Sequence, residues 1–162
     1  MSIENARAWL AQKGFSDRVQ EFTVSSATVE LAAEALQCEP CRIAKTLSFA
    51  VGERAVLVVM AGDAKVDNPA FKAAFGVKAK MLAGDEVESR IGHAVGGVCP
   101  FGICENVPVY LDESLRRFDI VYPACGSANS AVCLSFPELQ SAVQQFAGWV
   151  DVGKAWRDTP SL

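Results

Sequence analysis

Lys45 is the residue whose position in the sequence points most directly to chemistry. Residues 43–51, Ile-Ala-Lys-Thr-Leu-Ser-Phe-Ala-Val, are typical of a β-strand, in which alternate side chains face opposite sides. Lys45 then falls in an apolar row with Leu47 and Phe49. A lysine is rarely buried without a partner, so this one either extends its ammonium out of the core or faces a cleft that needs a positive charge. We favour the cleft.

A glycine-rich stretch at residues 92–102 is the second candidate. Gly96, Gly97 and Gly102 would let a ligand approach the main chain closely, and Pro100 would stiffen the loop. Successive N–H groups in such a loop can hold an anion or a developing oxyanion. The stretch matches neither the dinucleotide-binding nor the phosphate-loop motif. The alternative is a tight structural turn, and we favour a binding loop.

A turn of small residues at 124–130 is the third candidate. Small side chains would keep the wall of a pocket open, and Ser127, Asn129 and Ser130 offer hydrogen bonds. Taken alone, this segment is better interpreted as an ordinary turn.

The cysteines and the single histidine give weaker indications. Cys38 and Cys41 have the spacing of a redox or zinc pair, but no second pair or HxxxH motif accompanies them. Cys99 and Cys104 have only His93 nearby. A dyad of Cys99 with His93 is conceivable but has no local sequence signature. We therefore predict no metal and no cofactor, and interpret the thiols as buried or incidental.

Local charge provides the last candidate. The protein has a net charge of −4, which argues against broad nucleic-acid binding through a basic surface. Residues 65–80 nevertheless contain one acid, Asp67, and the lysines Lys65, Lys72, Lys78 and Lys80. This segment either meets a phosphate backbone or forms a solvated face, and the sequence favours neither.

Composition is that of a soluble globular protein. Of the 162 residues, 51% are hydrophobic and 21% are charged, which suits a single domain spanning 1–162. The N-terminal residues do not have the pattern of a signal peptide, and the apolar run 55–61 is too short to cross a bilayer. We expect a cytosolic protein with mostly reduced cysteines.

Elements that could position these residues follow from periodicity and from turn signals. Helices are expected at 2–13, 28–36 (capped by Ser25-Ser26), 68–75, 85–91, 113–117 and 136–146. Strands are expected at 21–25, 43–51, 55–61, 108–111, 119–123 and 131–135. Residues 43–51 and 55–61 should form a hairpin whose second strand lies centrally. The prediction is a mixed α/β domain with a mostly antiparallel central sheet surrounded by helices.

Several of these segments occur together in one known family. The segment Cys41–Phe49 with its I-x-K-T-L pattern, the strand that ends at Ala61-Gly62-Asp63, the loop 96–102 and the Ala124-Cys125-Gly126 turn stand in the order found in that family. Over roughly residues 20–147 the chain resembles the YbaK and prolyl-tRNA-synthetase-associated editing domains. The lysine in its strand and the G-x-x-x-P spacing of Gly96 and Pro100 are the most specific marks.

The resemblance implies hydrolysis of the ester bond in mischarged aminoacyl-tRNA, often tRNA for proline, by a protein that acts in trans. It implies that Lys45 is the essential lysine of the pocket. The substrate's 3′ end would contact Thr46 beside it, the loop residues Gly96, Gly97, Val98, Cys99, Pro100 and Phe101, and the turn residues Gly126 and Ser127.

An aminoacyl ester is already activated, so catalysis can rest on positioning and electrostatics. Loop amides from 97 to 99 would stabilise the oxyanion, and Lys45 would bind negative charge. The attacking group would be a water, which the resemblance implies is assisted by the neighbouring ribose hydroxyl. Aminoacyl-tRNA is the predicted partner, with prolyl-tRNA synthetase as a second one and with no DNA or membrane. The alternatives are a non-catalytic module that binds a tRNA end or a nucleotide, and a thiol redox protein that uses Cys38 and Cys41.

Overall fold

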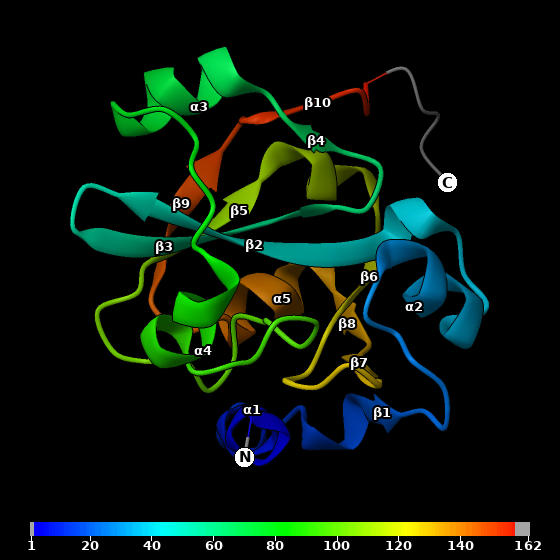
Figure 1. Cartoon of the computed structure of the whole chain (residues 1–162). Coiled ribbons are helices and arrows are strands. Elements are labelled where there is room, and N and C mark those ends of the chain that lie inside the picture. The colour runs from blue at the N-terminus through cyan, green and yellow to red at the C-terminus, as the bar shows by residue number, and fades with distance from the viewer. Residues whose placement is uncertain (1, 158–162) are drawn as a thin grey trace.

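The computed structural model describes residues 2–157, and its architecture is mixed α/β (Figure 1). Its α-helices are α1 (Ser2–Gln12), α2 (Val29–Leu36), α3 (Asn68–Phe75), α4 (Gly84–Ile91) and α5 (Phe136–Ala142). Its strands are β1 (Val19–Glu21), β2 (Ile43–Val51), β3 (Arg54–Ala61), β4 (Lys65–Val66), β5 (Val109–Asp112), β6 (Ile120–Pro123), β7 (Ser130–Val132), β8 (Leu134–Ser135), β9 (Phe146–Val150) and β10 (Gly153–Lys154). Short 3₁₀ helices cover Ser16–Arg18, Pro40–Arg42 and Glu113–Arg117.

The central sheet has the strand order β8-β6-β2-β3-β5-β9. Its longest pairing is the antiparallel hairpin of β2 and β3, which runs from Val51 opposite Arg54 to Ala44 opposite Ala61. Gly52 in the connecting turn has φ +62°, a conformation that glycine adopts without strain. Parallel pairings of β2 with β6, β3 with β5 and β5 with β9 make the sheet mixed. Two small antiparallel sheets, β1–β7 and β4–β10, flank it.

Both faces of the sheet are covered, which explains why β3 is apolar on both sides. Leu57 and Val59 belong to a core that lies beneath α1, α4 and α5, while Val56 and Val58 face Phe71 of α3. Figure 1 shows α3 on one side of the sheet, and α1, α4 and α5 on the other. Every residue of β3 after its first is buried, as expected for a strand covered on both faces.

Most of the expected helices and strands are found, but some of their boundaries differ from the prediction because tertiary contacts set them. Helix α2 is capped by Thr28, whose hydroxyl accepts from the Leu31 N–H, so the predicted Ser25-Ser26 cap is wrong. The predicted helix 136–146 ends at Ala142, because the next residues turn into strand β9, which pairs with β5. The predicted strand 131–135 is divided into β7 and β8, and β7 pairs with β1 at Val19–Glu21 rather than at 21–25. Pairing partners distant in sequence set these boundaries.

None of the helices within residues 2–157 is long and apolar enough to cross a membrane.

Candidate functional site

The outer edge of β2 is interrupted in its middle. At its start, β6 pairs with Ile43 and Ala44. Toward its end, the segment 80–82 bonds to the same edge of β2. The Ala50 N–H donates to the Lys80 carbonyl (2.8 Å), and the Leu82 N–H donates to the Ser48 carbonyl (3.1 Å). Between these two neighbours, no strand lies beside Thr46 among the described residues.

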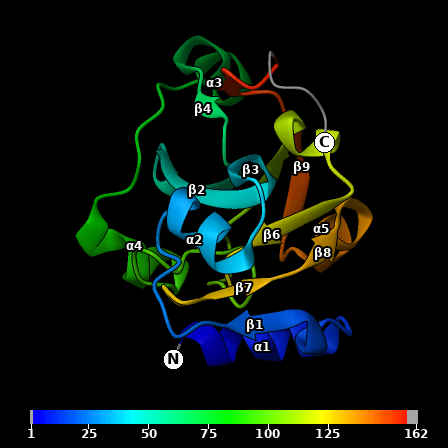
Figure 2. The same cartoon turned by 90° about the vertical axis from the view of Figure 1, so that its right-hand side faces the viewer.

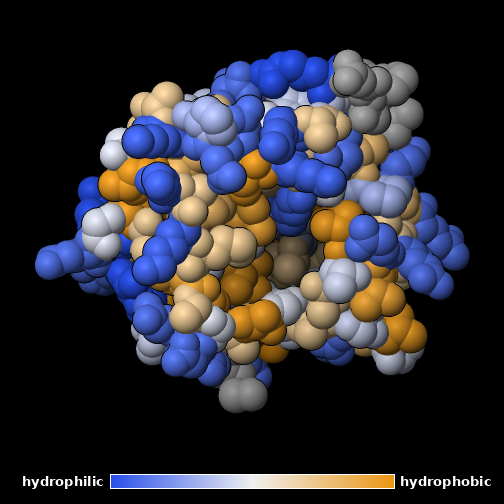
Figure 3. Space-filling model, turned by 45° about the horizontal axis from the view of Figure 1, so that its top comes forward, coloured by the Kyte–Doolittle hydropathy of each residue, from blue (hydrophilic) through white to orange (hydrophobic). Residues whose placement is uncertain are grey.

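A cavity of about 510 Å³ occupies this gap. Its walls come from six separate segments of the chain: 26–32, 43–48, 81–87, 95–98, 122–124 and 130–131. In Figure 2, α2 lies in front of β2, with α4 on one side and β6 on the other. Figure 3 shows a hollow in one face of the molecule, bordered largely by hydrophobic surface. Such a volume suits a small organic group.

The lining of the cavity is mainly apolar and carries few groups that could react. Hydroxyls come from Ser26, Thr28, Thr46, Ser48, Tyr122 and Ser130. Among residues 2–157, the only charged side chain in the lining is that of Lys45, and no cysteine, histidine or carboxylate contributes to it. Within residues 2–157, no group of three or more His, Cys, Asp or Glu residues is arranged to hold a metal ion.

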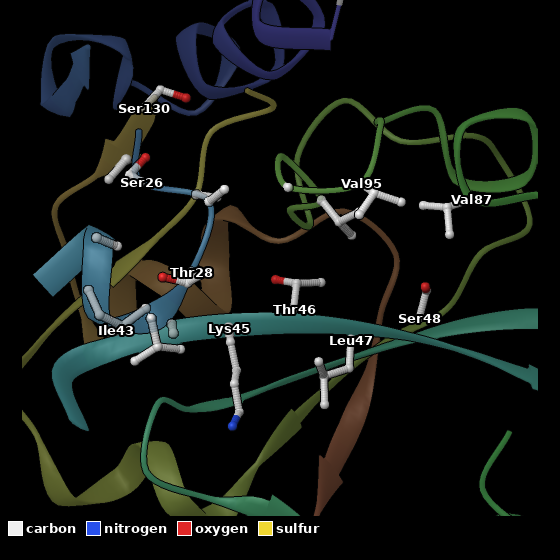
Figure 4. Close-up of a pocket in the computed structure, with 18 of the residues that line it drawn as sticks. Ser26, Thr28, Ile43, Lys45, Thr46, Leu47, Ser48, Val87, Val95 and Ser130 are labelled. Atoms are coloured by element: carbon white, nitrogen blue, oxygen red, sulfur yellow. The ribbon is translucent and has the colours of Figure 1, made fainter. Parts of the chain in front are cut away.

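Lys45 crosses from the floor of the cavity to the opposite face of β2. Figure 4 shows Thr46 and Ser48 pointing to one side of the strand, toward Val95 and Val87, and Lys45 pointing to the other. The Lys45 ammonium donates to the carbonyls of Gly62 (3.3 Å) and Ala64. An ammonium has three donors, so one remains for a ligand. Lys45 thus contributes to the cavity lining and is partly buried, while its ammonium is held on the other side of β2 at the Gly62–Ala64 turn.

Burial and nearby carboxylates have opposite effects on the pKa of the Lys45 ammonium. Burial lowers the pKa of the Lys45 ammonium, and the carboxylates of Asp63 and Glu30 act in the opposite direction. Asp63 lies in the turn whose carbonyls hold the ammonium. Its carboxylate accepts two hydrogen bonds from Arg117, of 2.5 and 2.9 Å. This bidentate pair is largely buried and fixes the turn that holds Lys45.

Gly62 permits the close packing of this turn. A Cβ at position 62 would lie 2.1 Å from the Pro40 carbonyl oxygen and 2.7 Å from a methyl group of Val29. Any larger residue would therefore displace the turn from α2 and from the connection before β2.

The predicted glycine-rich loop reaches the cavity with only part of its length. Gly96 and Val98 line the cavity, whereas Cys99 and Phe101 are fully buried in the core and Pro100 is buried as well. Of the loop amides expected to hold an oxyanion, the Gly97 N–H already donates to the Ala94 carbonyl (3.0 Å).

The predicted turn 124–130 packs directly against this loop. A Cβ on Gly97 would lie 2.6 Å from the Ser127 nitrogen and 2.7 Å from the Gly126 carbonyl carbon. Gly126 and Ser127 thus support the loop from behind rather than line the cavity. Ser127 Oγ lies 2.6 Å from Ser130 Oγ, and Ser130 does line the cavity.

His93 and Cys99 meet in the core, away from the cavity. His93 Nε2 lies 2.6 Å from the Phe101 carbonyl oxygen and 3.4 Å from Cys99 Sγ. Because the carbonyl can only accept, Nε2 carries the proton and donates, which leaves buried Nδ1 without a partner. Burial raises the pKa of the Cys99 thiol well above its ordinary value and lowers the pKa of His93. This pair has the properties of a structural contact, not of an activated nucleophile.

Cys38 and Cys41 are both free thiols. Burial raises the pKa of each, whereas a reactive thiol needs a lowered one.

The four lysines of residues 65–80 are all exposed. Lys65 lies in β4 and Lys72 in α3, while Lys78 and Lys80 lie in the segment that joins α3 to the cavity rim at Met81. None of them forms an ion pair within the described part of the chain.

Several cavity residues could not be found from the sequence. Ser26, Val29 and Ala32 come from the loop before α2 and from α2 itself, and Tyr122 comes from β6. Each looks like an ordinary loop or core residue locally, and only the packing of α2 and β6 beside β2 brings them together. No local signal marks them.

Comparison with known proteins defines the class of this fold and site. Residues 23–142 match the family described as the aminoacyl-tRNA editing domain. The chain belongs to this family, whose members are hydrolases that act on aminoacyl-tRNA.

Individual relatives agree with this assignment. The chain is 48% identical to the uncharacterised protein YwhH of Bacillus subtilis over 96% of this chain and 99% of YwhH. It is 30% identical to EbsC of Enterococcus faecalis, named as a candidate Cys-tRNA(Pro)/Cys-tRNA(Cys) deacylase, over 67% of each chain. It is 33% identical to the proline–tRNA ligase of Bacillus cytotoxicus over 65% of this chain, but over only 18% of the ligase.

Solved structures give the same result. The crystal structure of a candidate trans-editing enzyme for prolyl tRNA synthetase superimposes with a TM-score of 0.85 at 28% identity, covering 95% of this chain and 98% of that one. The fold expected from the resemblance is therefore confirmed.

Proposed function

We propose that this protein acts in trans to hydrolyse the ester bond of mischarged tRNA, and that its substrate is tRNA for proline carrying a small wrong amino acid. The cavity at the interrupted edge of β2 carries the proposal, because it is small, mainly apolar and adjacent to a lysine. The names of EbsC and of the trans-editing enzyme support the choice of tRNA, and the similarity to proline–tRNA ligases supports prolyl-tRNA synthetase as a second partner.

The cavity indicates a mechanism without a protein nucleophile. Its lining has no thiol, imidazole or carboxylate, and the nearest Cys–His pair is a neutral contact in the core. The attacking group is then a water, assisted by the neighbouring ribose hydroxyl of the substrate, and the ribose oxygen of the broken ester bond leaves as a hydroxyl. The protein contributes by holding the activated ester in position and by stabilising the charge that develops on its carbonyl oxygen.

Lys45 has two roles in this proposal. Two of its donors hold the Gly62–Ala64 turn in place, and the third binds negative charge of the substrate at the cavity margin, at the terminal phosphate or at the developing oxyanion. The 3′ end of the tRNA enters past Gly96 and Val98, with the exposed lysines of residues 65–80 near the acceptor stem.

Deacylation by Lys45 variants tests the proposal. We expect Lys45→Ala to lower the deacylation rate of alanyl-, cysteinyl- or seryl-tRNA(Pro) by about 100-fold or more, as for the loss of one stabilising donor. Lys45→Arg should restore little, since a planar guanidinium cannot reproduce two carbonyl contacts and one free donor in the same space. Lys13→Ala, which changes an exposed lysine after α1, serves as the control.

Two results would contradict the proposal. One is a Lys45→Ala protein that folds and deacylates at the wild-type rate. The other is a wild-type protein that binds charged tRNA and protects its ester bond, because a binding module would do so.

A further inference from the structure

The unpaired edge of β2 presents main-chain groups to the cavity. Along a strand in an antiparallel pair, successive residues direct their N–H and C=O alternately to one neighbour and to the other. Ser48 and Ala50 bond outward to the segment 80–82, so Thr46, two residues earlier, points the same way. Its N–H and C=O therefore face the gap, where nothing in the described chain bonds to them.

The gap lies within the sheet, between two segments that bond to β2, and not at a frayed end of the strand. Thr46 lies in the middle of the longest strand, and both neighbours that bound the gap, β6 and the segment 80–82, contribute residues to the cavity wall. The Thr46 Oγ1 beside them is buried and has no partner, although buried polar groups are almost always paired. A ligand or water in the cavity has to satisfy these groups.

We propose that the aminoacyl group of the substrate pairs with Thr46 as a single-residue antiparallel strand. This inference rests on the proposed function and deepens it. Two residues that face each other in an antiparallel pair can exchange two N–H···O bonds. An aminoacyl ester carries a donor and an acceptor in the same relation, since its α-ammonium and its carbonyl flank one Cα. The ammonium then donates to the Thr46 carbonyl, and the Thr46 N–H donates to the ester carbonyl.

This pairing has two functional consequences. The Thr46 N–H lies where negative charge develops on the ester carbonyl, so it supplies the oxyanion donor that the Gly97 amide, already bonded to Ala94, does not. The side chain of the aminoacyl group falls on the same face of β2 as that of Thr46, where Val87, Val95 and Val98 close the cavity. Main-chain pairing recognises any α-amino acid, and these walls limit its size.

The first test changes the substrate. Wild-type protein is given alanyl-tRNA(Pro), N-acetylalanyl-tRNA(Pro) and lactyl-tRNA(Pro), and each rate is divided by the rate of spontaneous hydrolysis of the same ester. We expect acetylation, which removes the ammonium, to lower this ratio at least 100-fold. For the lactyl ester, whose hydroxyl is a weaker and uncharged donor, we expect a ratio about tenfold lower than for the alanyl ester. Equal ratios for the three esters would overturn the pairing and leave the proposed function intact. No deacylation of any ester would overturn both.

The second test changes the main chain. Replacing Thr46 by its α-hydroxy acid analogue turns one amide into an ester, which removes the N–H and also weakens the Lys45 carbonyl as an acceptor in the β2–β3 pairing. Because that N–H has no partner within the fold, the melting temperature should fall by no more than about 4 °C through the weakened acceptor, while the deacylation rate falls at least tenfold. The same replacement at Ser48 removes the next N–H on the outward side of the strand and weakens the Leu47 carbonyl in the same way. Ser48 also lines the cavity, but the pairing does not use its N–H, so the rate should fall less than for the replacement at Thr46. A loss at Ser48 equal to or larger than that at Thr46, or an unchanged rate at Thr46, would overturn the inference.

Discussion

At the scale of single residues, burial separates groups that can react from groups that only pack. Cys99 and His93 are 3.4 Å apart, a distance that would suit a catalytic dyad. Both are fully buried, however, and the Nε2 proton of the histidine is directed to the Phe101 carbonyl. The thiol is thus held in its neutral form, outside the cavity. Lys45 differs because it belongs to the cavity lining and its ammonium keeps one donor beyond those bound to the Gly62 and Ala64 carbonyls.

Cys99→Ala tests this distinction. We expect the deacylation rate to stay within about twofold of the wild type, because the thiol contacts no substrate. The free energy of unfolding should fall by about 1–2 kcal/mol through the loss of buried sulfur, which a denaturant titration would measure. A loss of activity as large as that of Lys45→Ala, at unchanged stability, would instead make Cys99 a participant in the reaction.

At the scale of elements, part of the loop 92–102 forms a wall of the cavity, and the turn 124–130 packs against the side of the loop that faces away from the cavity. Gly97 is buried against the Gly126–Ser127 main chain, and this contact sets the positions of Gly96 and Val98 on the cavity side. The predicted binding loop is therefore a divided element: one part lines the cavity, and the part from Cys99 to Phe101 anchors it in the core.

Gly97→Ala should disturb the site through this contact. Its added Cβ would lie under 3 Å from main-chain atoms of Gly126 and Ser127, so the loop or the turn has to move. We expect at least a tenfold loss of deacylation and a lower melting temperature. Gly84→Ala is the control, because Gly84 lines the cavity but its Cβ would meet only a Val95 methyl at 3.9 Å. Equal rates for the two variants would contradict a supporting role for Gly97.

At the scale of the whole molecule, charge is distributed unevenly. The net charge is −4, yet the exposed Lys72, Lys78 and Lys80 lead from α3 to the cavity rim without carboxylate partners in the described structure. A local positive strip on an acidic protein can direct a polyanion to one site while the remaining surface repels it.

Changing Lys72, Lys78 and Lys80 together to glutamine tests this arrangement. We expect the dissociation constant for tRNA to rise, and the slope of log affinity against log salt concentration to decrease by about two to three. The rate at saturating tRNA should change little. Lys13→Gln, at the opposite end of the molecule from α3, should leave the slope unchanged. An unaltered slope in the triple variant would mean that the three lysines form only a solvated face.

The sequence alone determined the features that depend on local pattern. The β2–β3 hairpin follows from alternation and a two-residue turn. Helix α3 begins at Asn68 and ends at Phe75, as predicted, because Pro69 and Gly76 mark its ends. The position of Lys45 in an apolar row also follows from strand periodicity, and this one charge led to the site.

Only the tertiary structure decided how that site is built. The gap beside Thr46 exists because β6 stops pairing after Ala44 and the segment 80–82 begins pairing at Ser48, and no pattern within β2 encodes where its neighbours end. The direction of the Lys45 ammonium depends on the Gly62–Ala64 turn. The burial of Cys99 and Phe101 depends on a core assembled from distant segments. Local periodicity gives the face on which a residue lies, whereas long-range packing decides whether that face meets a core, a neighbouring strand or a cavity.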